Sequence, residues 1–438
     1  MATFLPFLTE IDPQAAIKGS RDPLGIQTIW SRLGRHVVGN LTTVTTSVRD
    51  FTTLILGYYF AERVAELRKD SDDLHVFLRW EQLAAHARYR INNDSTLRGI
   101  ERVKKAASEG GKIRICADTG QILSNQRTYG LWGLYSGPAR ASGLVDEGDP
   151  TRLTIASRRL VDEVYLPSFA STGMRNADQV VSLLSKDRID LDAEGKDGNF
   201  FIAVGKVLQP RLSKKEKELF QPHLLYGIAP DKTGNKQESV ARAIQSTLDD
   251  NDWLLSPARV RHLAKTCRSI GPAGEAASHC LERILVAEQM LAPAADLFDL
   301  LMGSDGQTLR EVAGTVGRVW GKQVPTIDGE RIAELETELR DSTGDVASGQ
   351  RWVQIAQALA GGNYADALRF LVEQNTFVMK TRAGGGAWIE LAQNRIKVRF
   401  RDENPGALPE RDELAGLWRH PYFLNAMRAI ALQLGSQP

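Results

Sequence analysis

The chain has little cysteine, almost no net charge and no long hydrophobic run, and each shortage excludes a class of protein. It contains 3 cysteines in 438 residues. This odd number at wide spacing argues against a disulfide framework and predicts a reducing compartment. Lysine and arginine (55) nearly balance aspartate and glutamate (54), and the net charge of +1 points to no nucleic-acid or acidic partner for the chain as a whole. Any charge argument must therefore be local.

No segment has the pattern of a signal peptide or a membrane span. The opening residues, MATFLPFLTEIDPQ, lack a basic region ahead of an apolar run. The apolar stretch 54–61 is too short to cross a bilayer and is followed by Glu62 and Arg63. The sequence therefore predicts a cytoplasmic protein without membrane contact. Arginine outnumbers lysine 38 to 17, a bias that is common in bacteria with GC-rich genomes.

Helical periodicity dominates the sequence and predicts a mainly α, multi-domain protein with short β-hairpins. Segment 72–92 carries an apolar stripe of helical period, 352–372 has the pattern of a helical hairpin, and 387–400 that of a β-hairpin. The expected regions are an N-terminal helical region (1–94), a winged-helix-like module (95–165), a linker with a β-hairpin turning at EGKDG (166–212), and a helical bundle or array with a C-terminal β-hairpin and closing helices (213–438).

The region 95–165 resembles a winged helix-turn-helix. Its helix-breaking residues and its hydrophobic periodicity predict a helix over 96–108, a strand over 112–116, two helical stretches ending near Gly143, and a hairpin around the turn DEGDP. This order, together with the phrase SGLV…LT, is similar to the recognition helix and wing of that family, which implies contact with DNA. Gly133 and Pro138 interrupt the stretch where a straight recognition helix would lie.

Local charge supports the same interpretation. Between Arg79 and Arg159 there are 14 basic and 8 acidic residues, a local excess that phosphates would attract. Basic residues also alternate with apolar ones on the predicted strand after residue 394. Solvated helix faces and the protection of an edge strand by charge are the structural alternatives. The candidate nucleic-acid-binding residues are Arg127, Arg140, Arg152, Arg395, Lys397 and Arg399.

Catalytic patterns are weak. A cluster of Asp190, Asp192, Glu194 and Lys196 has the residue types of a metal-dependent nuclease, but Gly195 favours a solvated turn. The stretch GRVWGKQ lacks the spacing and the hydroxyl of a phosphate-binding loop. The histidines and cysteines at 262, 267, 279 and 280 lack the spacing of a zinc site. We therefore assign no catalytic, cofactor or metal residue from the sequence.

These observations predict a non-catalytic DNA-associated or adaptor subunit of a bacterial multi-protein DNA-processing or antiviral defence system. Its expected partners are other protein subunits, with double-stranded DNA as a further candidate. A metal-dependent nuclease using the cluster of residues 190–196, and a purely structural helical scaffold, remain open as alternatives.

Overall fold

The computed structural model describes residues 22–173, 177–228, 231–383, 386–399 and 407–435. Within these ranges the protein is mainly helical with two short antiparallel strand pairs, as predicted. None of the helices described is long and apolar enough to span a membrane. Residues 1–21 of the predicted N-terminal region lie outside the described part of the chain.

The chain forms two compact units, and each is built from separate stretches of sequence. Unit 1 comprises residues 1–36 and 252–422, and unit 2 comprises residues 37–251 and 423–438. The last helix, α20 (Leu424–Gly435), therefore belongs to the unit that begins at Val37. The four regions expected from the sequence stay a prediction.

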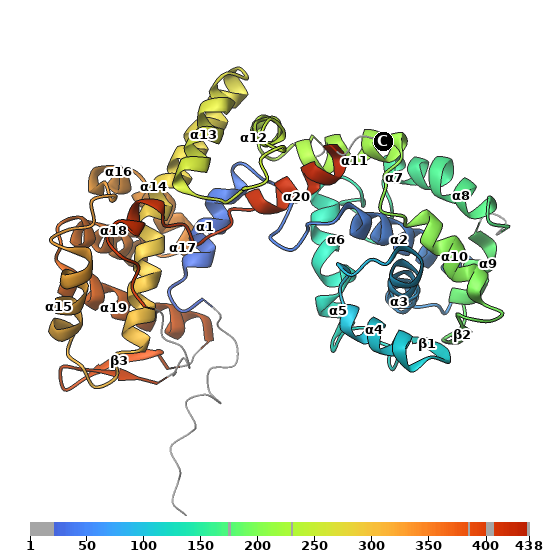
Figure 1. Ribbon diagram of the computed structural model, residues 1–438, viewed down its shortest axis with the longest axis horizontal. Coiled ribbons are helices and arrows are strands. Elements are labelled where there is room, and N and C mark those ends of the chain that lie inside the picture. Colours follow the sequence, from blue (N-terminus) through green and yellow to red (C-terminus); the bar gives the residue numbers. More distant parts are fainter. Residues whose placement is uncertain (1–21, 174–176, 229–230, 384–385, 400–406, 436–438) are drawn as a thin grey trace, which may run out of the picture. The chain divides into compact units, whose positions relative to one another are not determined.

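Unit 2 surrounds two buried helices with shorter ones and a two-stranded sheet (Figure 1). Its elements are α2 (Val48–Leu67), α3 (Asp73–Asn92), α4 (Ile100–Glu109), β1 (Lys112–Cys116), α5 (Gln126–Tyr129), α6 (Leu131–Ala141), α7 (Ile155–Leu160), a π-helical turn (Val161–Tyr165), α8 (Leu166–Ala170), α9 (Asp178–Leu184), β2 (Arg188–Asp192), α10 (Gly198–Val207), α11 (Lys214–Phe220), a second π-helical turn (Gln221–Tyr226), α12 (Lys236–Gln245) and α20.

Helices α2 and α3 form the centre of unit 2. From Val48 to Ala61 every residue of α2 is buried, which is the behaviour of a helix that is covered on all sides. The helix predicted over 72–92 is confirmed as α3, and the indole Nε1 of Trp80 donates to the Thr53 carbonyl of α2 at 2.8 Å. The two helices therefore pack directly on each other.

Buried ion pairs connect these helices to their surroundings. The Arg88 guanidinium lies 2.6 Å from Asp50 of α2 and 2.7 Å from Asp94. Arg49 pairs with Glu216 of α11, whose carboxylate also accepts from the Tyr165 hydroxyl at 3.0 Å. Because buried charges are costly unless they are paired, these contacts restrict how the surrounding helices can pack on α2.

The sheet of unit 2 corrects one prediction. Strand β1 pairs antiparallel with β2, with Arg114 opposite Asp190 and Ile115 opposite Ile189. The segment after the EGKDG turn, expected as the second strand of a hairpin with β2, instead forms α10. The predicted hairpin in the linker is therefore wrong: the strand partner comes from far earlier in the chain, and the apolar run FFIAVGKV packs as a helix against α3.

The predicted wing is reduced to one bridge. Val145 and Leu153 form an isolated antiparallel pair, and the Thr154 side chain caps α7, which begins at Ile155. The hairpin expected around the turn DEGDP is therefore shorter than predicted, because the chain turns into α7 at Ile155. The helix and the strand expected before it correspond to α4 and β1. Of the two expected helical stretches, the second, across residues 129–139, is formed by the end of α5 and by α6, whereas the first, expected over 118–123, forms turns.

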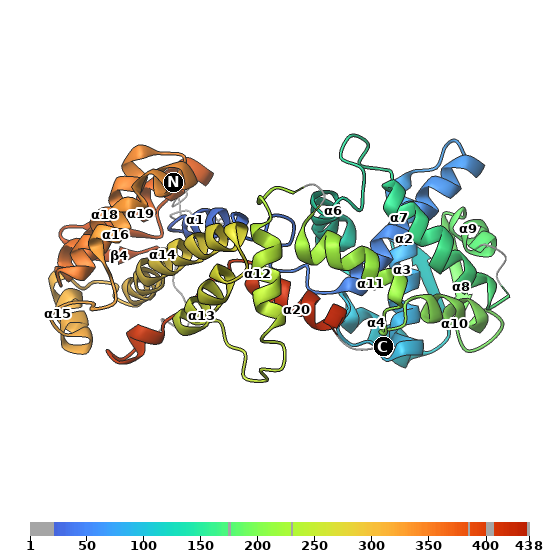
Figure 2. The same cartoon turned by 90° about the horizontal axis from the view of Figure 1, so that it is seen from above.

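Unit 1 is a helical assembly around one long helix, with a β-hairpin. Its elements are α1 (Ile26–Arg35), α13 (Pro257–Arg268), α14 (Pro272–Met302), α15 (Leu309–Trp320), α16 (Gly329–Glu334), α17 (Glu336–Thr343), α18 (Val346–Ala360), α19 (Tyr364–Ala383), β3 (Ile389–Ala392), β4 (Arg395–Val398) and a short 3-10 helix (Glu413–Gly416). Figures 1 and 2 both show α13 running beside α14, and α1 also packs on α14.

Two local predictions for unit 1 are confirmed. The helical hairpin expected over 352–372 is formed by α18 and α19, and the turn between them brings Gly362 against the Lys322 carbonyl, where a side chain would collide. The β-hairpin expected near residue 390 is formed by β3 and β4. Its two turn residues, Gln393 and Asn394, have positive φ angles, as a tight two-residue hairpin requires.

Gly57 permits the close contact between α2 and α3. A Cβ atom at this position would lie 2.6 Å from the buried ring of Phe77. We expect Gly57→Ala to destabilise the protein, because overpacking of a core costs about 1–3 kcal/mol, against a gain in helix propensity of about 1 kcal/mol. Gly314 of α15 has open space around its Cα, and Gly314→Ala should keep or raise the melting temperature. Thermal unfolding followed by circular dichroism measures both, and an equal response of the two variants would contradict the packing argument.

Candidate functional site

The three arginines predicted to bind nucleic acid in region 95–165 lie on separate elements. Arg127 is exposed on α5, Arg140 is half-buried on α6, and Arg152 is exposed beside the Val145–Leu153 bridge. Arg152 lies 3.1 Å from the carboxylate of Asp149, so its charge is partly compensated. Of the three, Arg127 is the exposed cation without a carboxylate partner among the described residues.

The local excess of positive charge is partly neutralised from elsewhere in the chain. Arg88 pairs with Asp50, Arg114 with Asp190, and Arg158 with Glu62. These acidic residues lie outside the segment 79–159 in which the excess was counted. The basic surface expected from the count is therefore weaker in the folded protein.

The second basic candidate lies on β4 and the residue that follows it. Arg395, Lys397 and Arg399 are exposed, and the first of them donates to the Gly306 carbonyl at 2.7 Å. Arg399 lies 2.7 Å from Glu390 of the neighbouring strand. Two of these three side chains are thus bound to their own unit, which leaves Lys397 as the cation without such a contact in the described part of the hairpin.

The carboxylate cluster of the nuclease alternative is bound by arginines and by its own turn. Asp190 of β2 lies 3.2 Å from Arg114 and 3.3 Å from Arg188, and the hydrogen bond from Arg114 lowers the pKa of this carboxyl below its ordinary value. Asp192 accepts the amide of Gly195 at 2.9 Å. Glu194 lies 3.4 Å from Arg90, while Lys196 follows in the same turn. In the described ranges no three His, Cys, Asp or Glu side chains are grouped as a metal site would require.

A basic helix face was not singled out from the sequence. Between Trp253 and Gly274 the chain has four arginine or lysine residues and one histidine, all on α13, and no acidic residue. Arg261, His262 and Lys265 are exposed on α13 and lie on one face, since they are three and four residues apart. No carboxylate among the described residues pairs with Arg261 or Lys265. We call these three residues the basic face of α13.

The ends of the basic face carry further cations. The Arg259 guanidinium lies over the ring of Trp253, 4.8 Å from its centroid. Arg268, in the last turn, pairs with Glu282 of α14. The run of basic residues without an acid is a signal that sequence inspection could have used, because all of it lies on one helix.

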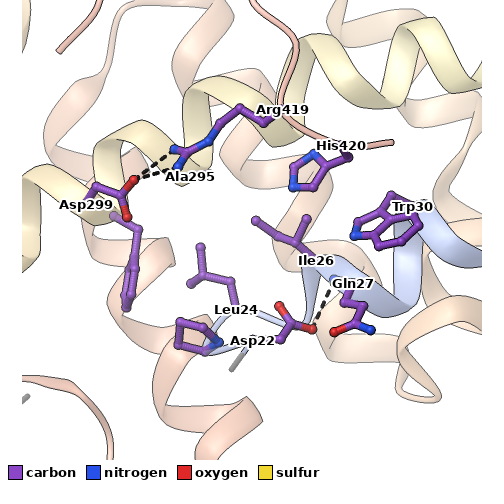
Figure 3. Close-up of a pocket in the computed structure, with 11 residues that line it drawn as sticks. Asp22, Leu24, Ile26, Gln27, Trp30, Ala295, Asp299, Arg419 and His420 are labelled. Atoms are coloured by element: carbon purple, nitrogen blue, oxygen red, sulfur yellow. Dashed lines mark hydrogen bonds and ion pairs between the residues drawn. The ribbon is translucent and has the colours of Figure 1, made fainter. Parts of the chain in front are cut away.

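A pocket of about 290 Å³ lies in unit 1 (Figure 3). It is formed by three stretches far apart in sequence: the start of α1 with the residues before it, the C-terminal half of α14, and the segment before α20. The lining residues are Asp22, Pro23, Leu24, Ile26, Gln27, Trp30, Ala295, Phe298, Asp299, Arg419 and His420. No short motif connects these stretches, so a single sequence could not bring them together.

A buried carboxylate fixes one wall of this pocket. The Glu288 side chain is 1% exposed and accepts from the Tyr422 hydroxyl at 2.7 Å, from His420 Nδ1 at 2.9 Å, and from the backbone amides of Arg419 and His420 at 2.6 and 3.1 Å. The imidazole also stacks beside Trp30, with ring centroids 6.4 Å apart. These contacts hold the His420 ring in one orientation.

Two aspartates of α14 bind Arg419. Its guanidinium lies 2.6 Å from Asp296 and 2.9 Å from Asp299, as Figure 3 shows for Asp299. Burial raises the pKa of Asp296 to about 6, although Arg419 acts in the opposite direction. The Oδ2 atom of Asp296 is buried and has no hydrogen-bond partner among the described residues.

Cys116, Cys267 and Cys280 are not joined in a disulfide, as the sequence predicts. Burial raises the pKa of Cys267 to about 12, so its thiol remains protonated near neutral pH.

Comparisons of the chain with protein-family models, with curated proteins and with solved structures found no match.

The raised pKa of Asp296 predicts a pH dependence of stability. A carboxyl group that titrates near 6 in the folded state and near 3.8 when unfolded binds more protons when folded, so its contribution to stability falls as the pH rises through that interval. Asp296→Asn should remove this part of the pH dependence and keep an oxygen for Arg419. Denaturant unfolding of wild type and variant at about pH 4 and about pH 7 measures the difference.

Asp366→Asn is the matched control, because Asp366 is an exposed aspartate that pairs with Arg369 at 3.1 Å. A wild-type pH dependence that persists unchanged in Asp296→Asn would contradict the assignment.

Proposed function

We propose that the protein is a non-catalytic, nucleic-acid-associated adaptor subunit of a bacterial multi-protein DNA-processing or antiviral defence system in the cytoplasm. The observation that carries the nucleic-acid part is the basic face of α13. Its cations are exposed, and Arg261 and Lys265 have no carboxylate partner among the described residues. Their charges are therefore available to phosphates.

The geometry of α13 suits contact with a phosphate backbone. Arg261 and Lys265 are separated by four residues, or about 6 Å along the helix, so two phosphates of one strand can be contacted at once. Contacts of this kind position a protein on nucleic acid without reading its sequence. They depend on salt, because each phosphate that is neutralised releases counterions.

The winged-helix-like module is part of the same proposal. The order of α4, β1, α5, α6 and the Val145–Leu153 bridge supports it, although β1 pairs with β2 and not with the predicted wing. Arg127 and Arg140 would then supply further phosphate contacts from unit 2. The arginine pairing of Asp190 gives no specific support to the nuclease alternative.

The adaptor part rests on architecture. Two compact units built mostly from helices provide large surfaces on which other protein subunits can pack. The exposed apolar side chains of Leu254 (73%) and Ile155 (84%), one in each unit, are candidates for such contacts.

The proposal predicts that reversing the basic face weakens DNA binding in a salt-dependent way. Arg261→Glu with Lys265→Glu should lower the affinity for a short labelled duplex, and should make the log–log salt slope shallower by about 1 for each phosphate that is no longer neutralised. Fluorescence anisotropy between about 50 and 200 mM salt measures both quantities. The melting temperature should change little, because both side chains are exposed.

Two further variants locate the contact. Arg310→Glu with Lys322→Glu changes the net charge equally at two other exposed positions of unit 1 and should retain binding. Replacement of Arg127, Arg140 and Arg152 by alanine tests the contribution of unit 2. Equal affinities for the α13 variant and its charge-matched control would remove α13 from the interface, and wild-type protein that binds no DNA, even with its partner subunits, would refute the nucleic-acid part.

A further inference from the structure

A groove of unit 1 lies between α16 and α18, which pack on each other (Figure 1). Its volume is about 670 Å³, and its walls come from α16, the two residues before it and the second half of α18. Gly329, Ala333 and Ala360 line it, and these residues are too small to fill it. A Cβ atom at Gly329 would meet only Gln357, at an ordinary contact distance of 3.8 Å. The groove can therefore receive side chains from outside.

The groove is acidic. Asp328 and Glu330 line it and are exposed, and no cation among the described residues lines it or pairs with either carboxylate. Asp328 Oδ1 accepts the amides of Glu330 and Arg331 at 3.1 and 3.2 Å, which fixes the position of this carboxylate. Five acidic residues and one basic residue occupy the segment 328–338. A surface that docks in the groove should therefore be basic.

The basic face of α13 has the complementary charge. Arg261, His262 and Lys265 are exposed on it, and the long side chains of arginine and lysine can extend into a groove of small residues while their charged ends meet carboxylates at its edge. In both views of the molecule α13 lies apart from α16 within unit 1 (Figures 1 and 2), so the pairing requires two copies of the chain. The net charge of +1 does not keep the copies apart.

We propose that the basic face of α13 of one copy docks in the acidic groove between α16 and α18 of a second copy. Two different surfaces meet, so each copy still offers one groove and one α13, and the association continues into rings or chains. One helix face in one groove is a small interface, and we therefore expect weak, reversible association.

The consequence for regulation rests on the function proposed for α13. A basic face that lies in a groove is not available to phosphates, so self-association and nucleic-acid binding compete for the same cations. Nucleic acid that binds α13 should dissolve the association, and the association should hold α13 in reserve when nucleic acid is scarce.

Sedimentation velocity of the full chain without nucleic acid tests the contact. The wild-type sedimentation coefficient should rise with protein concentration at low salt and return toward the monomer value at high salt, since exposed charge pairs are screened. Arg261→Glu with Lys265→Glu (the α13 variant) and Glu330→Lys with Gln357→Lys (the groove variant) should each weaken the association about tenfold. Asp328 is left in place because it caps α16.

A mixture of the two variants gives the sharpest result. The α13 variant keeps its acidic groove and the groove variant keeps its basic face, so the mixture should form a heterodimer and no larger species. Ala333→Phe fills the groove without changing its charge and should also prevent association. Arg310→Glu with Lys322→Glu has the net charge of the α13 variant, changes two other exposed positions, and should associate as wild type does.

Wild-type protein that stays monomeric at every concentration would overturn the proposal and point to a basic segment of another protein as the occupant of the groove. A monomeric mixture, or a charge-matched control that dissociates as the α13 variant does, would also overturn it. The groove variant keeps its α13 and should bind a labelled duplex at least as tightly as wild type. If no variant binds the duplex while self-association follows the expected pattern, the nucleic-acid function fails and the contact between copies stands.

Discussion

A charged group that leaves water must be paired, and in unit 1 this requirement falls on the carboxylate of Glu288. It lies on α14, the longest of the helices described, and the hydrogen bonds that it accepts from described residues come from Arg419, His420 and Tyr422. Losing one partner of a buried charge costs several kcal/mol, so this stretch of chain is held against α14 in one arrangement. The orientation of the His420 ring and its packing beside Trp30 follow from it. In unit 2 the buried guanidiniums of α2 and α3 meet the same requirement.

Local patterns predicted the elements whose partners are close in sequence. The stripe of Phe77 and Trp80 indicates α3, and the alternation around Gln393 indicates the β3–β4 hairpin, because a helix face or a tight turn is encoded within a few residues. The pairing of β1 with β2 spans more than seventy residues, and nothing near residues 188–192 indicates it. The run FFIAVGKV was assigned wrongly for the related reason that a short apolar run fits a strand or a helix equally well.

The difference between partners that are close in sequence and partners that are far apart also explains the outcome for the candidate sites. Counting charges over residues 79–159 overestimated the basic surface, because acidic residues such as Asp50, Glu62 and Asp190 fold back onto it. On α13 the count remains useful, since its cations share one helix, and no carboxylate among the described residues pairs with Arg261 or Lys265. The pocket escaped sequence inspection altogether, because its walls come from three stretches that only the fold brings together.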